Sequence, residues 1–528
     1  MNSRLFDFTG FTEFYRLLKP LSPYGRQALQ SLPWHTRRED LEAWYDRVDL
    51  LLEYRRGSRE LKDRLEYHLR RLPEIPSPEE EAFSSDDLFL FKRYLYNLKA
   101  LSDLLPPEVR TAFHLEFTLG DLLSRLSVDG SQESFQIADA YSPRIALLRK
   151  ELRLLDQEIT ALRRRRCEDI REQTGLDFLM KDFIILDPRR AGGIPTDLIY
   201  REPYDSRSFI LRPTMTEEYY DRYSRRDDLA EEELEEERGI LKALGTLVSE
   251  HREPLKNCRE AVTDFEKAWI VASAAEEYGM VRPRLLSPGS PPFVARGRCL
   301  PLELECSNRG VDYQSLDFSP ATGISVIRGP NMGGKTTLLK TLGFFQLLSQ
   351  QGFFIPAEEC RLSLFDSLHL VAPQRGDTGG QGLSGYGQEV LSLAEALDSP
   401  GDHRLFLIDE FGSTTTSRDA RALNEALLEI LAQRGLNAFL ATHILDLCLP
   451  SGVSVYRMAG LRQGGLESLS EAGRGENLEN RIRLLNKNMI YTPEPETEKD
   501  RGSDALIIAD YLGLDAELLR RASKKMGL

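Results

Sequence analysis

The chain has 528 residues, of which 41% are hydrophobic, and this is enough for about three structural units with a core each. Its 69 Lys and Arg residues against 84 Asp and Glu residues give a formal net charge of −15. This acidic balance excludes a general electrostatic attraction of the whole molecule to nucleic acid or to an anionic membrane, so any such binding must come from local patches. The amino terminus lacks the apolar core of a signal peptide, and no stretch of about 20 apolar residues follows. We therefore expect a soluble, cytoplasmic protein that does not span a membrane.

The cysteines form no motif for metal or redox chemistry. None has the C-x-x-C spacing of zinc ribbons and dithiol redox sites. We expect reduced thiols, as in a cytosolic protein, at Cys167, Cys258, Cys299, Cys306, Cys360 and Cys448.

Residues 1–141 have the pattern of a helical domain. Ser22 precedes Pro23, a pair typical of a helix start, because a hydroxyl caps the first turn and proline tolerates the first helical position. No metal-binding or nucleophile constellation interrupts this region, so we interpret it as a helical scaffold. Apolar residues at helical spacing are Leu41, Trp44, Tyr45, Val48, Leu51 and Leu52.

Residues 142–284 have the pattern of two long helical arms. In the first arm, apolar residues alternate steps of three and four over roughly three heptads, which predicts a coiled-coil seam. A second arm over about 216–255 carries apolar residues at compatible spacing, so the two arms are expected to pair antiparallel. The first seam comprises Ile145, Leu148, Leu152, Leu155, Ile159 and Leu162, and the second Leu234, Leu241, Leu244 and Val248.

A small β-rich module is predicted between the arms, near 175–214. The runs MKDFIILDP and SRSFILRP are rich in strand-forming residues and are separated by Gly192, Gly193 and Pro195. Residues 181–214 contain six basic and five acidic side chains. This near-neutral balance is unlike the basic stripe that DNA binding normally requires.

A phosphate-binding loop is predicted in the α/β region that begins near residue 285. The run ISVIRGPNMGGKTTLLK places a strand, a glycine-rich turn and a helix in the order that G-x-x-x-x-G-K-T needs. In this pattern Gly329 and Gly334 let backbone N–H groups close around a phosphate, Lys335 reaches the β- and γ-oxygens, and the Thr336 hydroxyl ligates Mg²⁺.

Two further strand ends supply the remaining groups that hydrolysis needs. The apolar residues 405–408 lead directly into Asp409 and Glu410, which are placed to hold Mg²⁺ and to orient and deprotonate water. A later apolar strand, 437–441, delivers Thr442 and His443 to the same sheet edge, where a neutral imidazole can sense the γ-phosphate.

A polar turn over 383–387 precedes another predicted helix. Ser384 and the N–H groups around it are suited to binding a phosphate at a helix start. Within one chain this turn has no obvious target, which suggests that it completes the site of a second subunit; a plain helix cap is the alternative.

Together these residues resemble the MutS family of ATPases, a branch of the ATP-binding-cassette superfamily. The run GPNMGGKTT is nearly the family's phosphate loop, DEFGSTTTSRDA resembles the loop that follows its catalytic carboxylates, and ATH at 441–443 matches its switch. The resemblance implies ATP and Mg²⁺, with Thr336 and Asp409 at the metal and Glu410 and His443 in catalysis. It implies ATP contacts from Gly329, Pro330, Asn331, Met332, Gly333, Gly334, Lys335, Thr336 and Thr337.

The resemblance also implies a homodimer or a MutS-like heterodimer, in which Ser384 and Gly385 of one subunit face the nucleotide of the other. The stretch VDYQSLDFSP aligns with the segment that stacks on adenine, which makes Tyr313 a candidate. Residues 486–502 resemble a linker in composition, and 503–528 are similar to the helices that pack in MutS dimers.

The departures from the family limit the expected function. The chain begins at the lever region, so we expect neither the mismatch-recognition domain nor the connector, and it ends soon after the packing helices, so we expect no nuclease. Ser413 and Thr414 replace the arginine and glycine of the family's G-R-G-T-S loop.

The expected fold is mixed: a helical core and lever region at 1–141, coiled-coil arms at 142–284, and an α/β P-loop ATPase domain of the cassette type at 285–485. The expected function is that of a dimeric MutS-like ATPase that binds duplex or branched DNA without reading mismatches directly, in repair or recombination. The alternative is an ATPase that remodels a protein or a ribosome, such as a subunit of a reactivating factor for cobalamin-dependent aminomutases; the net negative charge favours this reading.

Overall fold

A computed structural model of the chain divides it into two compact units. The first unit comprises residues 1–63 and 262–528, and the second comprises residues 64–261. Helices α5 (Arg59–Arg71) and α12 (Arg252–Tyr278) contain the two points of division. The structure describes residues 3–79, 82–128, 130, 135–187, 189, 194–205, 207–329, 333–373, 385–461, 478–496 and 504–526.

This division differs from the domain boundaries expected from the sequence, because the first four helices belong with the carboxyl-terminal half. Phe14 packs edge-on against Phe344 and Phe353, with ring centroids 5.6 and 5.4 Å apart. The Trp44 indole donates a hydrogen bond to the Gly352 carbonyl at 2.8 Å. These contacts join residues that are at least 308 positions apart into one core, which no local sequence pattern predicts.

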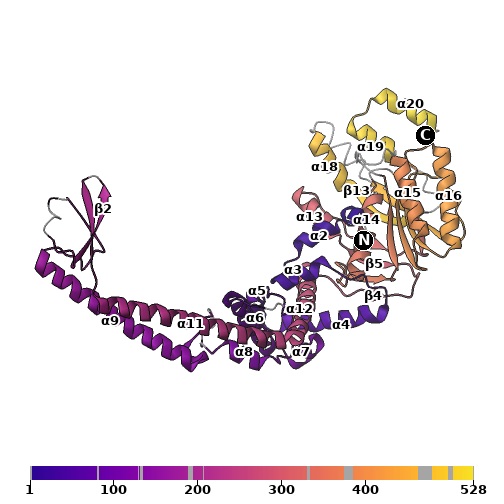
Figure 1. The fold of residues 1–528 in the computed structure, drawn as a ribbon. Coiled ribbons are helices and arrows are strands. Elements are labelled where there is room, and N and C mark those ends of the chain that lie inside the picture. Colours follow the sequence, from indigo (N-terminus) through magenta and orange to yellow (C-terminus); the bar gives the residue numbers. More distant parts are fainter. Residues whose placement is uncertain are drawn as a thin grey trace. The chain divides into compact units, whose positions relative to one another are not determined.

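Two sheets organise the described part of the first unit (Figure 1). The larger has six strands in the order β13-β12-β7-β11-β10-β9, parallel except for the antiparallel pair β12–β13, and the smaller has the order β4-β8-β5-β6. The strands are β4 (Arg284–Leu285), β5 (Phe293–Gly297), β6 (Leu316–Phe318), β7 (Ile324–Arg328), β8 (Glu359–Leu362), β9 (Ser367–Val371), β10 (Arg404–Asp409), β11 (Asn437–Thr442), β12 (Val453–Leu461) and β13 (Met489–Pro495).

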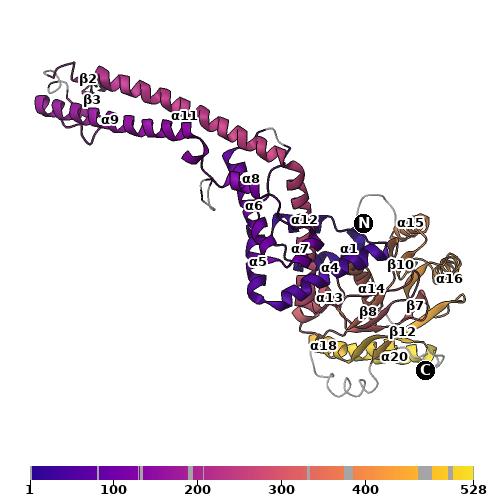
Figure 2. The same ribbon diagram turned by 90° about the horizontal axis from the view of Figure 1, so that it is seen from below.

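Helices cover both faces of the larger sheet (Figure 2). Helix α14 packs against β10 and β11 and is nearly all buried, because α1 covers its other side. Phe406 and Ile408 face the opposite way and form a core with Leu427 and Leu428 of α16. The helices of this unit are α1 (Ser3–Thr9), α2 (Phe11–Leu17), α3 (Pro23–Gln30), α4 (Arg38–Gly57), α13 (Leu300–Asn308), α14 (Lys335–Gln350), α15 (Gly385–Asp398), α16 (Ser417–Gln433), α18 (Leu478–Asn488), α19 (Asp504–Leu512) and α20 (Ala516–Met526).

The linker expected over 486–502 is wrong for residues 486–495. Residues up to Asn488 belong to α18, and Met489–Pro495 form β13, an edge strand paired with β12. Its polar composition and prolines suggested a mobile segment, but an edge strand tolerates proline because one side of its backbone needs no partner. Residues 497–503 lie outside the described residues.

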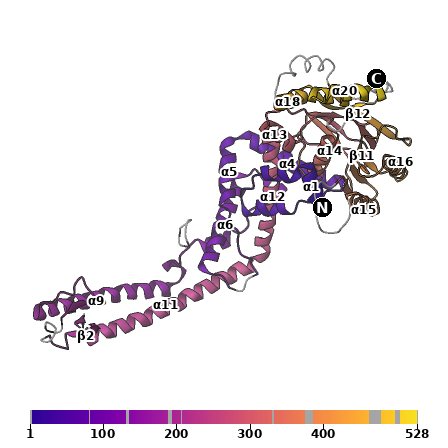
Figure 3. The same cartoon turned by 90° about the horizontal axis from the view of Figure 1, so that it is seen from above.

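The second unit contains the paired arms, which lie side by side in Figures 2 and 3. Arg149 of α9 pairs with Glu233 and Glu237 of α11. Asp156, which lies further along α9, pairs with Arg226, which lies earlier in α11. The residue numbers run in opposite directions, so the helices are antiparallel. The elements of this unit are α6 (Ser85–Leu104), α7 (Pro107–Phe113), α8 (Gly120–Leu126), the 3-10 helix η1 (Asp139–Tyr141), α9 (Pro143–Thr174), β1 (Ile184–Leu186), β2 (Ile199–Asp205), β3 (Ser208–Pro213) and α11 (Glu217–Glu250).

A three-stranded antiparallel sheet, in the order β1-β3-β2, lies between the arms in sequence, where the β-rich module was predicted. Its inner face packs Leu211 and Ile199 on Ile170 near the end of α9. Along the arms, Leu148 and Leu152 are buried against Leu229. Leu234, expected in the seam, is 47% exposed, and Leu229 of α11 makes the contact with α9.

All six cysteines are free thiols, and three of them are buried. Within the described ranges, no helix combines the length and apolar character that crossing a membrane requires.

Candidate ATP-binding site

The predicted site residues follow three neighbouring strands of the larger sheet. Strands β7, β11 and β10 are parallel and adjacent, with Arg328 opposite Thr442 and Ala441 opposite Asp409. Their carboxyl ends therefore meet at one edge, where parallel sheets commonly bind ligands. Because β11 lies between the other two strands, the phosphate loop, the two carboxylates and His443 converge although more than 100 residues separate them.

Lys335 begins helix α14 at this edge and is only 3% exposed. Gly334 caps the helix with φ 89°, and a Cβ there would lie 2.8 Å from the Tyr491 ring, so both backbone conformation and space require glycine. The Lys335 ammonium donates to the Gly329 carbonyl at 2.8 Å and lies 3.4 Å from the Glu410 carboxylate. A buried cation at a helix amino terminus is suited to an anionic ligand.

Thr336 and Asp409 lie together beside this lysine. The Thr336 hydroxyl is 2.9 and 3.1 Å from the two carboxylate oxygens of Asp409, to which it donates. Burial raises the pKa of Asp409, while the Thr336 hydrogen bond opposes the rise and the Glu410 charge adds to it. The two residues thus present hard oxygen ligands side by side.

This pair fits Mg²⁺ held together with a phosphate ligand. No group of three His, Cys, Asp or Glu residues that could form a metal cage occurs in the part of the chain that the structure describes. Mg²⁺ at nucleotide sites is usually held by one or two protein oxygens, with phosphates and waters completing the shell. Thr336 and Asp409 supply that number of ligands.

Glu410 has a left-handed backbone conformation, with φ 50°, which is uncommon for a residue other than glycine. Its N–H donates to the Ala441 carbonyl at 2.9 Å, and its carbonyl accepts from Ser413 N–H at 3.0 Å. These bonds hold the residue in a strained turn that directs the side chain away from the strand. Such strain persists where surrounding contacts enforce it and often marks functional positions.

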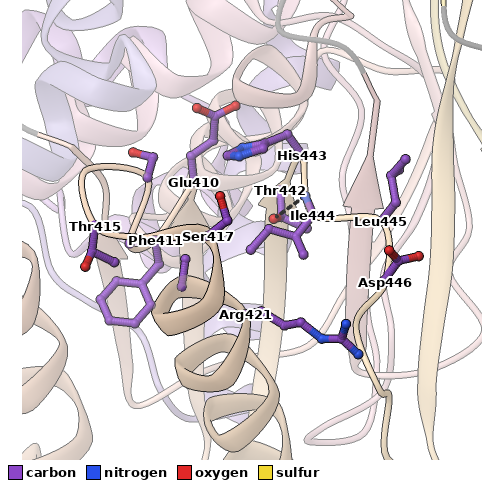
Figure 4. Close-up of a pocket in the computed structure, with 13 residues that line it drawn as sticks. Glu410, Phe411, Thr415, Ser417, Arg421, Thr442, His443, Ile444, Leu445 and Asp446 are labelled. Carbon is purple, nitrogen blue, oxygen red and sulfur yellow. Dashed lines mark hydrogen bonds between the residues drawn. The ribbon is translucent and has the colours of Figure 1, made fainter. Parts of the chain in front are cut away.

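His443 lies beyond β11 and is exposed, beside a pocket of about 260 Å³ that Glu410 also lines. Figure 4 shows Glu410 and His443 at the same end of this pocket, with Arg421 at the other end. Residues Ser413 and Thr415 of the intervening loop line the pocket too. Glu410 also lines a second, larger cavity.

The second cavity is lined by Gly334 and the start of α14 and has a volume of about 1020 Å³. Lys335, Thr336 and Asp409 line one part, and the aromatic residues Tyr313 and Tyr491 line another. A polar region and an aromatic region in a cavity of this size suit a small ligand that has an anionic and a flat apolar part.

The structure anchors Tyr313 and adds Tyr491, which sequence reasoning missed. The Tyr313 hydroxyl accepts a hydrogen bond from Cys299 N–H at 2.8 Å, and burial raises its pKa. Gln314 donates to the Met489 carbonyl and accepts from Tyr491 N–H, at 2.7 and 3.1 Å, so it ties the segment around Tyr313 to β13. Tyr491 was missed because its segment was interpreted as a linker.

The remaining predicted residues are less informative. Pro330, Asn331, Met332 and Ser384 lie outside the described residues. Gly333 is buried and Thr337 lines the larger cavity. Gly385 begins α15, is exposed and lines neither of the two cavities, so the structure does not bring it to the phosphate loop of its own chain.

A comparison with known proteins finds a family match in the part of the chain that carries these residues. A family model described as MutS domain V matches residues 325–458, which span β7 to β12. The endonuclease MutS2 of Geobacillus thermodenitrificans is 27% identical over 417 residues, covering 75% of this chain and 47% of that protein. The DNA mismatch repair protein MutS of Thermus thermophilus is 28% identical over 466 residues, and that of Thermus aquaticus is 29% identical over 462 residues, each covering 84% of this chain and 54% of the relative.

The chain spans about half the length of the curated relatives it matches. The matched family domain coincides with the strands and loops that carry Lys335, Asp409 and Glu410, and the similarity to full-length relatives extends well beyond it. The chain is therefore similar to MutS and MutS2 proteins over most of its length, and residues 325–458 match MutS domain V.

Proposed function

We propose that this chain binds ATP together with Mg²⁺ and hydrolyses it. The observation that carries the proposal is the meeting of Lys335, Thr336, Asp409 and Glu410 at one sheet edge, within a cavity of about 1020 Å³. These four residues provide a cation, two metal ligands and a base, which are the groups that phosphoryl transfer to water requires.

Each residue has a distinct task in this proposal. Lys335 neutralises charge on the phosphates, and Thr336 with Asp409 would hold Mg²⁺, which would withdraw negative charge from the phosphate oxygens and so favour attack by water. Glu410 accepts the proton of that water at its carboxylate. His443, near Glu410, senses whether the terminal phosphate is present.

The aromatic side chains define where the base of the nucleotide binds. Tyr313 and Tyr491 come from segments joined through Gln314 and line the same cavity as Lys335. Stacking of a purine on an aromatic ring needs only a flat face, and the hydroxyl bond to Cys299 keeps Tyr313 in place. We propose that adenine contacts these two tyrosines.

The complete site requires two subunits in this proposal. Ser384 and Gly385 of one subunit face the nucleotide of the other, in a homodimer or in a heterodimer with another MutS-like chain. The exposed position of Gly385, away from its own cavity, is compatible with a role toward a second subunit.

DNA, duplex or branched, is the proposed cargo. Relatives that match most of this chain are named as a DNA mismatch repair protein and as an endonuclease. The antiparallel helices α9 and α11, with the small sheet between them in sequence, form an arm that would contact the cargo. We propose binding without direct reading of a mispaired base.

A protein or ribonucleoprotein cargo is the second candidate. The contacts that arginines in and near the three-stranded sheet make within the second unit favour it. Arg166 donates to the carbonyls of Thr214 and Asp197, Arg212 pairs with Glu202 at 3.8 Å, and Arg163 pairs with Asp182. Guanidinium groups engaged in this way are less available to phosphates. Remodelling of a ribosome or of a cobalamin-dependent aminomutase belongs to this candidate.

The hydrolytic activity is tested by measuring ATP turnover of the purified chain with and without Mg²⁺. Thr336→Val removes the proposed metal ligand without changing the shape of the side chain, and we expect turnover to fall about 100-fold or more. Thr341→Val is the matched control, because Thr341 lies on the same helix and lines neither of the two cavities. Equal turnover in both variants would contradict the proposed site.

The cargo is tested by binding to labelled homoduplex, mismatched duplex and four-way-junction DNA, with and without a non-hydrolysable ATP analogue, across a salt series. Nucleotide-dependent binding that weakens steeply with salt would support DNA. Absence of binding even at about 50 mM salt would favour the protein cargo, because electrostatic contacts to phosphates are strongest at low salt.

A further inference from the structure

Glu389, on helix α15, is a buried acid to which the proposed function assigns no role. Its residue is 1% exposed. One carboxylate oxygen, Oε2, accepts a hydrogen bond from Gly412 N–H at 3.0 Å, and Oε1 has no hydrogen-bond partner among the described residues. Burial raises the pKa of this carboxyl, against the Gly412 bond and the charge of Arg4. A half-satisfied buried acid destabilises a fold, so its presence calls for an explanation.

The bond from Glu389 reaches the turn that orients Glu410. Gly412 follows Glu410 by two residues and has φ 78°, a left-handed conformation that favours glycine. Glu410 shares the turn through the hydrogen bond between its carbonyl and Ser413 N–H. From the other side, the Asn424 amide of α16 donates to the Phe411 carbonyl at 3.0 Å. The direction of the Glu410 side chain therefore depends on contacts from both α15 and α16.

Helix α15 is also attached to the opposite end of the strand that carries Glu410. Arg404, the first residue of β10, is buried and donates to the carbonyls of Ala396, Leu397 and Ser399 at 3.0, 3.1 and 2.8 Å. Glu389 makes its bond just beyond the last residue of β10. Helix and strand are thus tied at both ends, and a shift of the amino-terminal end of α15 must pull on the turn after Glu410.

We propose that Glu389 is a positioning residue that couples the amino-terminal end of α15 to Glu410, so that docking of a second subunit there aligns Glu410 for hydrolysis. This inference rests on the proposed function, in which residues 384 and 385 face the nucleotide of the other subunit. Glu389 itself lines neither of the two cavities. Its effect passes through one hydrogen bond to Gly412.

The test compares Glu389→Ala with Glu389→Gln in the full chain. Turnover per chain is measured over a range of protein concentrations, together with KM and with ATP-induced dimerisation by light scattering. In the wild type, turnover per chain should rise with concentration as dimers form. In E389A we expect kcat to fall about tenfold or more and the rise to disappear, with KM changed less than about threefold and dimerisation retained.

The glutamine variant separates positioning from general damage. Its side-chain carbonyl can still accept the Gly412 hydrogen bond, so we expect E389Q to keep kcat within about threefold of the wild type and to keep the concentration dependence. Glu395→Ala, an exposed acid on the same helix, is the matched control and should behave as the wild type. If E389A does not fold, Glu389→Asp takes its place, because it keeps the charge but shortens the reach by one methylene.

The outcomes distinguish the inference from the function on which it rests. A wild-type chain without ATP turnover would overturn the proposed function and the coupling with it. A wild type whose turnover rises with concentration, together with an E389A variant that does the same at full rate, would overturn the coupling alone. Equal losses in E389Q and E389A, with equal falls in melting temperature, would show a structural role and also overturn it.

Discussion

The sheet edge of the first unit and the helical arm of the second unit use charged residues in opposite ways. At the sheet edge, Lys335 and Asp409 are buried and each bonds to particular partners at short distance. Along the arm, pairs such as Arg226 with Asp156 and Arg222 with Glu158 are largely exposed, and other pairs lie nearby. Buried polar groups are costly unless they are satisfied, so single changes there should have large effects, whereas exposed pairs share their contribution with neighbours.

The largest expected effect is the loss of hydrolysis in Glu410→Gln. An amide cannot accept the proton of the attacking water, so we expect kcat to fall about 10²- to 10³-fold while ATP still binds. Single-turnover hydrolysis and binding of a fluorescent ATP analogue measure the two properties separately. An arm variant such as Arg226→Ala serves as the contrast and should leave hydrolysis without cargo unchanged. Full turnover in E410Q would remove Glu410 from the catalytic role.

The next effect is on stability, in the small sheet of the second unit. Leu211 is fully buried among Phe178, Ile199 and Leu198, and Leu211→Ala would leave a cavity there. We expect a loss of about 2–4 kcal/mol in the local stability of this module. Hydrogen exchange should accelerate in β1, β2 and β3 and not in β7, β10 and β11 of the first unit.

Tyr200→Ala is the control for this variant, because Tyr200 lies in the same sheet but is mostly exposed. Its exchange rates should match the wild type. If L211A instead accelerated exchange at β7 and β10, the two units would not be independent in stability, and the comparison between them would fail.

A smaller effect is expected from Lys267, a partly buried charge in the first unit. Lys267 lies over the Trp44 ring at 4.5 Å, and burial lowers its pKa from 10.5 to about 8, with Asp264 opposing and Arg47 adding to the shift. Between these two values the unfolded chain binds more protons than the folded chain, so the folded state becomes relatively more stable as pH rises. The cost is complete below about pH 8 and is relieved toward pH 10.

Lys267→Met should therefore stabilise the protein by about 1–2 kcal/mol at pH 7, and this gain should shrink by pH 10. Urea unfolding of the variant and the wild type at both pH values measures the difference. A gain that is the same at both pH values would mean that packing of methionine, and not removal of the charge, is responsible.

The smallest expected effects are on stability, when either of two arginines in the helical arm is replaced. Arg149 donates to Glu233, Glu237 and Asp139 at 2.6, 2.7 and 2.9 Å, whereas Arg226 contacts Asp156 at 3.3 Å in an exposed position. We expect Arg149→Ala to cost about 1 kcal/mol and Arg226→Ala less than about 0.5 kcal/mol, because a network of partly buried charges exceeds an isolated surface pair. Thermal unfolding at low and high salt measures both, and the Arg149 effect should decrease with salt. Equal losses would show that the network adds nothing.

Much of the candidate site follows from the sequence because its residues are close to strand ends. Asp409 ends an apolar strand and Glu410 follows it, while Lys335 and Thr336 follow another apolar strand after a glycine-rich loop; the structure brings the four together. Tyr491 and Glu389 could not be found in this way. The first lies on an edge strand that resembles a polar linker, and the second is one of many acids on an amphipathic helix.

The two arms also show that helical spacing alone does not decide which side chains are buried. The spacing of Leu148 and Leu152 predicted a buried seam, and both side chains are buried. Leu234 had equally good spacing but is exposed, because the face of α11 that turns inward depends on where α9 lies. The helical period therefore gives the possible faces of a helix, and the packing partner selects one of them.

Local pattern in the sequence was sufficient to predict the paired arms, the β-rich module between them and the buried strands that precede Gly329 and Glu410, since these depend on residues within about ten positions of each other. Only the tertiary structure decided that residues 1–63 share a unit with residues 262–528, that β13 closes the sheet beside β12, and that Glu389 holds the turn after Glu410. The reason is physical: hydrogen bonds and buried contacts between distant segments depend on the folded path of the whole chain, and no short stretch of sequence contains that path.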